Sequence, residues 1–284
     1  MCFNRYLLGA AALAVAVPAA AQDDTAPPPP ITVSGAATLA SEYRFRGISQ
    51  SDKDLAVQAG ITINHESGFY VGAWGSNLAG WGTFGGSNTE LDLLGGFKLP
   101  LGDSGGVLDV GLTWYMFPGG ANKTDFAEPY AKLAGTIGPV SLTAGVAYAP
   151  EQQALGRWYF TGADAAAGVY NDPGDKEDNV YLWGDFAVGV PNTPLTAKAH
   201  IGYSNGNPGL GPNATAVAPT GEYWDWSLGV DVSPIRGLTL NVSYVDTDIS
   251  VAQGSYLYPS FSRGQDGTGS IADGVIVVSA TASF

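Results

Sequence analysis

Hydrophobic and polar residues alternate along twelve stretches of the chain between residues 35 and 284. In one stretch Leu108, Val110 and Leu112 fall on one face, while Asp109 and Thr113 fall on the other. A period of two indicates β-strands with two unlike faces, because successive side chains of a strand point to opposite sides. The stretches are 38–46, 55–64, 69–76, 90–99, 108–115, 127–137, 140–148, 179–188, 195–203, 224–231, 238–244 and 276–284. The pattern therefore predicts an all-β protein of twelve strands.

The connections between these strands alternate in length. Short turns rich in Gly, Pro, Asn and Asp lie at 65–68, 100–106, 138–139, 191–194 and 234–237, and the long connections include 150–177, 204–222 and 247–273. An even strand number with turns at one end and loops at the other is typical of bacterial outer-membrane barrels. We predict a closed antiparallel transmembrane β-barrel of 12 strands, with short periplasmic turns and long extracellular loops. Ten or fourteen strands stay open if 150–177 or 247–273 contains a hairpin.

Aromatic residues gather at the ends of the predicted strands, on the apolar face. Those at the long-loop ends are Tyr43, Phe45, Trp114, Tyr148, Tyr203, Trp224, Trp226 and Tyr244, and those at the turn ends are Phe69, Phe97 and Phe284. Two such rings are expected where a barrel meets the two membrane interfaces. A soluble β-sandwich, the alternative, has no reason to place its large aromatics at strand ends. We therefore predict a membrane girdle of these residues.

The N-terminal region predicts export. Arg5 precedes an apolar run at 7–17, and three alanines at 19–21 resemble a cleavage site. This arrangement predicts a signal peptide at 1–21 rather than a buried helix, its alternative. Residues 22–34 contain four consecutive prolines and predict an extended periplasmic leader before a barrel at 35–284. The one cysteine, Cys2, lies in the predicted signal peptide, so no disulfide is expected.

Composition narrows the class of protein. Aromatic residues make up 11% and charged residues 13% of the chain, which disfavours intrinsic disorder. After residue 21 no run of 18 apolar residues occurs, so a helical membrane protein is not expected. The 12 basic residues are outnumbered by 26 acidic ones, which would repel phosphate, and no nucleic-acid partner is expected.

The polar face of the predicted barrel carries most of the chemistry. The side chains expected to line the pore or its constriction are Glu42, Arg44, Arg46, Trp74, Glu90, Asp92, Asp109, Tyr115, Glu128, Lys132, Asp185, Lys198, Asp225 and Asp231. Acids outnumber bases on this face, so a conducting barrel is expected to show a mild preference for cations. Opposed charges at one depth predict a constriction, with Arg44 and Arg46 on one side and Glu90, Asp92 and Glu128 on the other. The alternative is that these charges pair across the lumen and plug it, as in small filled barrels.

Two motifs suggest other chemistry and are given less weight. The string at 102–106, Gly-Asp-Ser-Gly-Gly, matches the nucleophile motif of serine proteases, but it lies in a predicted turn, where these residues are ordinary. The acidic loop at 172–178 could hold calcium but lacks the spacing of an EF-hand. The chain has two histidines, and the string at 102–106, which also fits Gly-x-Ser-x-Gly, lies between two predicted strands and not at the elbow between a strand and a helix. We expect no enzymatic activity, no metal and no cofactor.

Several segments go beyond a general barrel pattern. They are YRFRGISQSD at 43–52, SGFYVGAWGSN at 67–77, ELDL at 90–93 and FAEPY at 126–130. Together these segments resemble the TorF family, whose members are assigned as porins. The resemblance implies an outer-membrane barrel with an undefined substrate. The terminal Phe284 resembles the signal recognised by the outer-membrane assembly machinery.

These observations predict a porin-like channel in the outer membrane of a Gram-negative bacterium. It would let small hydrophilic solutes or ions diffuse passively. Its expected partners are outer-membrane lipid, the assembly machinery through Phe284, and small polar solutes. The alternative is a non-conducting barrel scaffold whose acidic extracellular loops bind a partner or ion.

Overall fold

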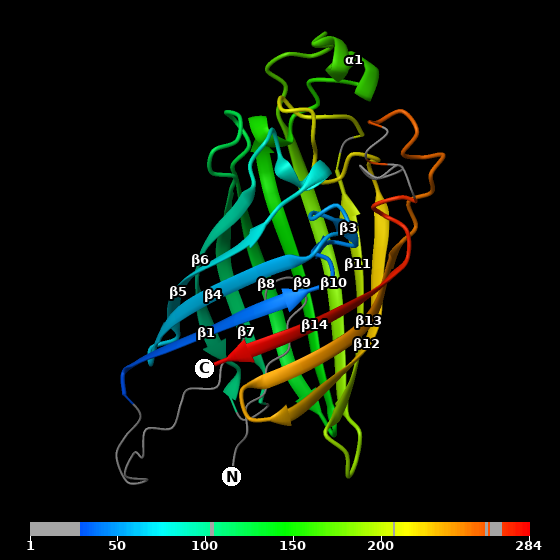
Figure 1. Ribbon diagram of the computed structural model, residues 1–284. Helices are drawn as coiled ribbons and strands as arrows, with labels where there is room; N and C mark the ends of the chain where they lie inside the picture. Colours follow the sequence, from blue (N-terminus) through cyan, green and yellow to red (C-terminus); the bar gives the residue numbers. More distant parts are fainter. Residues whose placement is uncertain (1–28, 103–104, 207, 259–260, 262–268) are drawn as a thin grey trace.

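A computed structural model describes residues 29–102, 105–206, 208–258, 261 and 269–284 and shows a closed barrel of antiparallel strands (Figure 1). The strands follow one another around the wall in the order β1-β14-β13-β12-β11-β10-β9-β8-β7-β6-β5-β4. The predicted fold class and the count of 12 strands are confirmed. The predicted signal peptide, most of the predicted leader, and Asp103 and Ser104 of the protease-like string lie outside the described residues.

The wall strands agree closely with the alternating stretches. They are β1 (Ile31–Ala40), β4 (Ala56–His65), β5 (Phe69–Asn77), β6 (Thr89–Pro100), β7 (Val107–Met116), β8 (Phe126–Ile137), β9 (Val140–Gln152), β10 (Glu177–Gly189), β11 (Leu195–Asn205), β12 (Tyr223–Ile235), β13 (Leu238–Thr247) and β14 (Val275–Ser283). Pairing between Ala36–Ala40 of β1 and 279–283 of β14 closes the barrel. β1 starts at Ile31, so the barrel begins four residues earlier than the predicted boundary at 35.

Short turns and long loops lie at opposite ends of the barrel (Figure 1). We call the end that carries the long connections the loop end. The connection between β9 and β10 contains the short helices η3 (Gln153–Leu155) and α1 (Gly162–Ala167) and no hairpin. Thr161 caps α1 through a reciprocal pair of hydrogen bonds with Asp164. Within the described part of the chain, no helix is long and apolar enough to cross a membrane.

The main departure from prediction is at the first predicted strand. β1 ends at Ala40, and the chain then leaves the wall, so that residues 41–55, which we call the inner loop, fold into the lumen. There β2 (Arg44–Phe45) and β3 (Ile48–Ser49) form a two-stranded hairpin. The inner loop contacts inward side chains from strands on several sides of the barrel, which places it between them. Residues 43–46 alternate as a wall strand does, because successive side chains again have two kinds of partner. Tyr43 and Phe45 pack on aromatic rings, whereas Arg44 and Arg46 pair with carboxylates.

Tyr43 and Phe45 are therefore wrongly predicted as girdle residues. The Tyr43 ring packs edge-on against Trp74 of β5, with 5.4 Å between centroids. The Phe45 ring packs in the same way against Tyr115 of β7, at 5.7 Å. These inward aromatics bury the two rings inside the lumen, so neither is available to the membrane interface.

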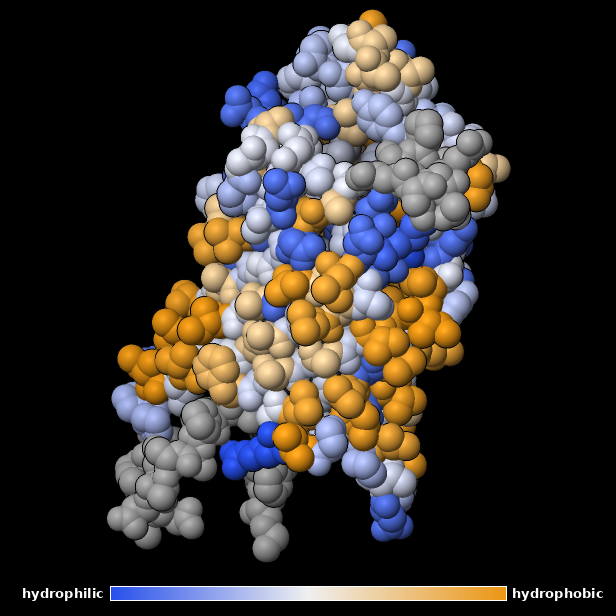
Figure 2. All heavy atoms as spheres, viewed as in Figure 1, coloured by the Kyte–Doolittle hydropathy of each residue, from blue (hydrophilic) through white to orange (hydrophobic). Residues whose placement is uncertain are grey.

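The outer wall of the barrel is apolar. Leu228 and Val242 are among many hydrophobic side chains left exposed there, and Figure 2 shows them gathered over the strands, with more hydrophilic loops at the loop end. The other aromatics of the predicted girdle lie on this outer face: Trp114, Tyr148, Tyr203, Trp224, Trp226, Tyr244, Phe69, Phe97 and Phe284. An apolar outside and a polar inside are the reverse of a soluble barrel.

The loop end is roofed by a hydrophobic cluster. Trp81 from η1 (Gly80–Thr83) packs edge-on against Phe261, and Trp158 and Leu210 come from two other long loops. Ile48 of the inner loop belongs to the same cluster. The roof therefore joins the long loops to the inner loop beneath them.

Candidate functional site

The inner face of the barrel carries the residues that the sequence pattern placed in the lumen. Those that are buried are Glu42, Arg46, Trp74, Glu90, Asp92, Asp109, Tyr115, Glu128, Asp185 and Asp225, and those that stay partly exposed are Arg44, Lys132, Lys198 and Asp231. Whether these side chains line a conducting path stays a prediction. Their contacts define a candidate site around the inner loop.

Arg46 is at the centre of this site. Its guanidinium donates one hydrogen bond from Nη2 to Glu128 Oε1 at 2.6 Å and another from Nη1 to Asn179 Oδ1 at 2.7 Å. The guanidinium carbon also lies 4.1 Å from the centroid of the Tyr181 ring, which is a cation–π contact. The tip of the inner loop is thus bound to β8 and β10 through one side chain.

The backbone at the tip is folded tightly. Arg46 has a φ of 48°, in the left-handed region that few non-glycine residues adopt, and Gly47 follows with a φ of 79°. A Cβ on Gly47 would collide with Thr247 and come within 3.0 Å of the Cβ of Asp225. Only glycine therefore allows the tip to approach β12 and β13 this closely.

The wall side of the site is held by its own hydrogen bonds. Tyr115 donates to Glu128 Oε2 at 3.2 Å, and Asn179 Nδ2 donates to the carbonyl of Asn205 at 2.9 Å. Tyr181 donates to the carboxylate of Asp225 at 3.1 Å. Each of the three groups that face Arg46 thus has a partner elsewhere on the wall, which fixes its direction.

Protonation within the inner loop follows from this environment. Burial by itself would lower the pKa of Arg46, but the Glu128 carboxylate outweighs that effect and raises the pKa above its ordinary value. Burial raises the pKa of Tyr43, and the carboxylates of Glu90 and Asp92 raise it further. Arg46 is therefore a permanent cation and Tyr43 a neutral phenol.

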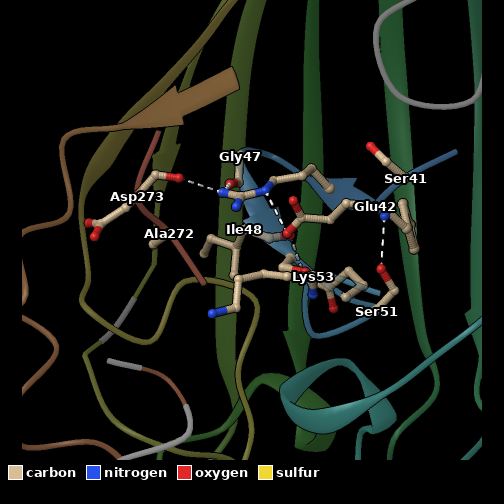
Figure 3. A network of polar contacts seen from close by, with 12 residues as sticks. Ser41, Glu42, Gly47, Ile48, Ser51, Lys53, Ala272 and Asp273 are labelled. Atoms are coloured by element: carbon tan, nitrogen blue, oxygen red, sulfur yellow. Dashed lines mark hydrogen bonds and ion pairs between the residues drawn. The ribbon is translucent and has the colours of Figure 1, made fainter. Parts of the chain in front are cut away.

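Arg44 anchors the other side of the inner loop. Its Nε lies 3.0 Å from Glu42 Oε1, and Nη1 donates to the carbonyls of Gly47 at 2.7 Å and Asp273 at 2.9 Å (Figure 3). Further backbone hydrogen bonds join Ser49 to the carbonyl of Ile271. The inner loop is thus tied to the connection before β14 as well as to the wall.

Two carboxylates of β6 have no basic partner. Glu90 and Asp92 are 4% and 3% exposed, and among the described residues neither forms an ion pair. Tyr43 is hydrogen-bonded to Glu90, whereas Asp92 Oδ1 has no hydrogen-bond partner in the described structure. This part of the lumen therefore has a local excess of acid.

His200 forms a second polar cluster in the middle of the lumen. Its Nδ1 lies 2.7 Å from Asp185 Oδ1, and its Nε2 lies 3.1 Å from Asp225 Oδ1 and 2.9 Å from the Tyr181 hydroxyl. Both ring nitrogens are thus occupied by wall residues, which leaves neither free to activate a serine. The cluster acts as a structural brace behind Tyr181.

The turn end of the lumen holds simpler pairs. Asp109 accepts a hydrogen bond from Tyr70 at 2.7 Å and pairs with Lys132 at 3.4 Å. Lys198 pairs with Asp231 at 3.3 Å. The two ion pairs join neighbouring strands, β7 with β8 and β11 with β12, whereas the Tyr70 hydrogen bond reaches from β5 past β6 to β7.

The inner loop fills the lumen at its own depth. The space enclosed by Phe45, Phe84, Glu90, Tyr115 and their neighbours has a volume of about 10 Å³, which is close to the room that one water molecule needs. The inner loop and the wall therefore leave little free space between these residues.

The described residues offer no metal centre. Nowhere within them do three His, Cys, Asp or Glu side chains come together in a way that could hold an ion. In the acidic loop at 172–178, Asp175 instead accepts the backbone N–H of Arg157 at 2.8 Å.

Sequence reasoning missed three residues of the site: Asn179, Tyr181 and His200. They fall on the polar face of their strands, but the sequence pattern does not show which charged group such a side chain contacts until the neighbouring strands are known. The strand register supplies that signal, since it pairs Asp185 with His200 across β10 and β11.

The chain matches, over residues 24–284, the profile of Gcw_chp, a family of bacterial proteins of unknown function. The chain belongs to this family. No curated protein matches it. The Gcw_chp profile does not carry the TorF name, so the resemblance to TorF porins stays a prediction.

Solved structures of outer-membrane channels align with this Gcw_chp protein. The NanC porin aligns with a TM-score of 0.52 at 10% identity, covering 88% of this chain and 99% of the porin. An outer membrane channel from Pseudomonas putida F1 aligns with a TM-score of 0.43 at 10% identity, over 92% of this chain and 98% of that channel. The outer membrane channel DcaP of Acinetobacter baumannii aligns with a TM-score of 0.41 at 12% identity, over 89% of this chain and 97% of that channel. The likeness to NanC shows a common barrel fold.

Proposed function

We propose that this protein is a porin-like channel of a bacterial outer membrane, which passes small hydrophilic solutes or ions down their gradient without covalent chemistry. The observation that carries the proposal is the pairing of an apolar outer wall with a lumen lined by charged side chains. A wall of this kind is stable only in lipid, where a closed sheet satisfies every backbone group. The NanC porin shares this fold, which agrees with the proposal.

The described conformation is the closed state of the proposed channel. Residues 41–55 occupy the lumen and are held by side chains such as Arg46 and Arg44 rather than by a continuous sheet. The two-residue strands β2 and β3 pair only with each other. Opening would require these few contacts to break, while the twelve wall strands stay paired.

Single-channel recording in a planar bilayer tests the proposal. We expect the purified protein to open rarely, and a variant with residues 42–54 replaced by a short Gly-Ser linker to show larger and longer current steps. Removal of residues 162–168, which carry α1, is the matched control because α1 lies at the tip of the loop end and outside the lumen (Figure 1). A barrel that resists SDS at room temperature, yet stays silent after the inner loop is replaced, would overturn the channel.

We also propose a preference for cations. Glu90 and Asp92 support it, because they place two carboxyl groups beside the inner loop and have no basic partner among the described residues. Fixed charge that faces a narrow pore sets which ions enter it.

A second function is favoured by one observation, the filled lumen. If the inner loop never leaves, the protein is a barrel scaffold that presents its roofed loops to a partner at the cell surface. The silent-barrel outcome above, in both wild type and the loop variant, would support this scaffold and contradict the channel.

A further inference from the structure

We propose that the wall pocket now filled by Arg46 is a binding site for small organic cations, above all those that carry a guanidinium group, and that Arg46 occupies it as a tethered competitor. This inference rests on the proposed function in one respect: it names the class of solute that the open channel would recognise. The pocket consists of Glu128, Asn179 and Tyr181, and we call it the cation pocket.

The cation pocket offers a guanidinium the three kinds of contact that it binds best. Glu128 supplies a carboxylate at 2.6 Å, and Asn179 supplies an amide oxygen at 2.7 Å from the second nitrogen of the same guanidinium. Tyr181 presents the face of its ring 4.1 Å from the central carbon. A planar fork that donates two hydrogen bonds and stacks on a ring fits this geometry better than a compact ammonium.

The cation pocket does not depend on Arg46 for its shape. Its residues belong to wall strands β8 and β10, which both pair with β9. Tyr115, Asn205 and Asp225 lie on other wall strands and hold these side chains by hydrogen bonds that do not involve Arg46. If the inner loop withdraws, the acceptors and the ring are expected to stay in place.

Charge makes the emptied pocket selective. With Arg46 gone, Glu128 would join Glu90 and Asp92 as a third buried carboxylate without a basic partner. Asp92 already has an oxygen atom without a hydrogen-bond partner. A buried carboxylate without a counter-charge raises the free energy of the folded protein. A cation that enters from solution and pairs with it removes this penalty and is bound more tightly for that reason. An anion or a neutral sugar would leave this cost in place.

The tether explains why the pocket is filled in the closed state. Arg46 is six residues beyond the end of β1, so its guanidinium is held near the pocket at an effective concentration in the millimolar range or above. A free cation must compete with it. Wild type is therefore expected to bind such ligands weakly, and removal of the tethered side chain is expected to reveal the pocket.

Isothermal titration calorimetry of the detergent-solubilised full chain tests the inference, with agmatine as the guanidinium probe and glutamate and xylose as comparison solutes. We expect Arg46→Ala to bind agmatine at least about tenfold more tightly than wild type, and glutamate and xylose not at all. Arg157→Ala is the matched control, because it removes an arginine outside the inner loop, whose guanidinium lies over Phe160 and not in the cation pocket. Its affinity for agmatine is expected to equal that of wild type.

Further variants decide whether the cation pocket itself binds the probe. Glu128→Gln added to Arg46→Ala is expected to return the affinity to the wild-type value. Equal binding with and without Glu128, or an equal gain in Arg157→Ala, would overturn the inference. If Arg46→Ala does not refold, Arg46→Met keeps the length of the side chain without its charge and is subject to the same expectation.

The outcome is separable from that of the channel proposal. Calorimetry reports binding without any current. Tight agmatine binding by a barrel that never conducts would uphold the cation pocket and contradict the channel. A conducting barrel whose Arg46→Ala variant does not bind agmatine would uphold the channel and contradict the cation pocket.

Discussion

Arg46 carries the tip of the inner loop to the barrel wall, where its guanidinium meets Glu128, Asn179 and the ring of Tyr181. A charge buried to this extent is stable only with a counter-charge and filled hydrogen bonds. Both are present, and each partner is held by a further wall residue. At the scale of single residues, the closed state thus depends on one ion pair that is almost free of water.

We expect Glu128→Gln to lower the free energy of unfolding by about 3 kcal/mol, because it leaves the Arg46 cation buried without its counter-charge. Urea titration of protein refolded into lipid vesicles, followed by tryptophan fluorescence, measures this loss. Asp231→Asn is the control. Its partner Lys198 has a side chain that is 32% exposed, and such a pair contributes less than about 1 kcal/mol. Equal losses of unfolding free energy in both variants would show that the buried Arg46–Glu128 pair contributes no more to stability than the more exposed Lys198–Asp231 pair.

The strands and the inner loop follow different rules at the scale of elements. Wall strands are held by long registers of paired residues, such as Ile31–Ala40 of β1 against 56–65 of β4. The inner loop has the β2–β3 hairpin, side-chain contacts and a few isolated backbone hydrogen bonds, such as that from Ser49 to Ile271. The inner loop is therefore expected to open at a lower free energy than the sheet around it, because fewer backbone pairs hold it.

β12 provides a test of which surface faces lipid. Leu228 lies near the middle of the strand and is 62% exposed on the outer wall, whereas Ile235 at the strand end is 66% exposed. In lipid, Leu228→Arg is expected to cost about 2 to 4 kcal/mol and Ile235→Arg about 0 to 1 kcal/mol, because the penalty for a charge depends on its depth. Urea unfolding in vesicles measures both. If the two arginines cost the same, the middle of β12 does not face hydrocarbon.

Across the whole molecule, charge is distributed unevenly along the lumen. The acids without basic partners, Glu90 and Asp92, lie at the depth of the inner loop, whereas the turn end contains compensated pairs such as Lys198 with Asp231. An ion in the proposed channel would therefore meet one acidic zone beside the inner loop. A zone of this kind acts over about 10 Å at 0.1 M salt and over less at higher salt.

We expect the ratio of potassium to chloride permeability, obtained from reversal potentials in the inner-loop variant, to exceed one at low salt and to fall as salt rises. Glu90→Gln with Asp92→Asn in the same background is expected to abolish most of the preference. Asp185→Asn is the control, because that carboxylate lies with His200, away from the inner loop. A chloride preference, or a cation preference unchanged by the double substitution, would contradict the assignment of the acidic zone.

The alternation of residues such as Leu108, Asp109 and Val110 was sufficient to predict the number of wall strands and, for the strands after the first, the face that their side chains take. A strand has only two faces, so a short sequence pattern decides between them. Even Pro129, which lacks an N–H, stays within β8, where it pairs with Leu112 of β7. Nearby, Gln152 supplies the hydrogen bonds that Ala127 does not receive from a neighbouring strand.

The tertiary structure alone decided where the residues after Ala40 go. Tyr43, Arg44, Phe45 and Arg46 alternate just as a wall strand does, and nothing within ten residues distinguishes the two placements. The distinction lies in partners more than 80 residues away, such as Glu128 and Asn179, whose arrangement exists only once the barrel has closed. Local periodicity therefore determined the wall, whereas contacts between distant strands determined what fills it.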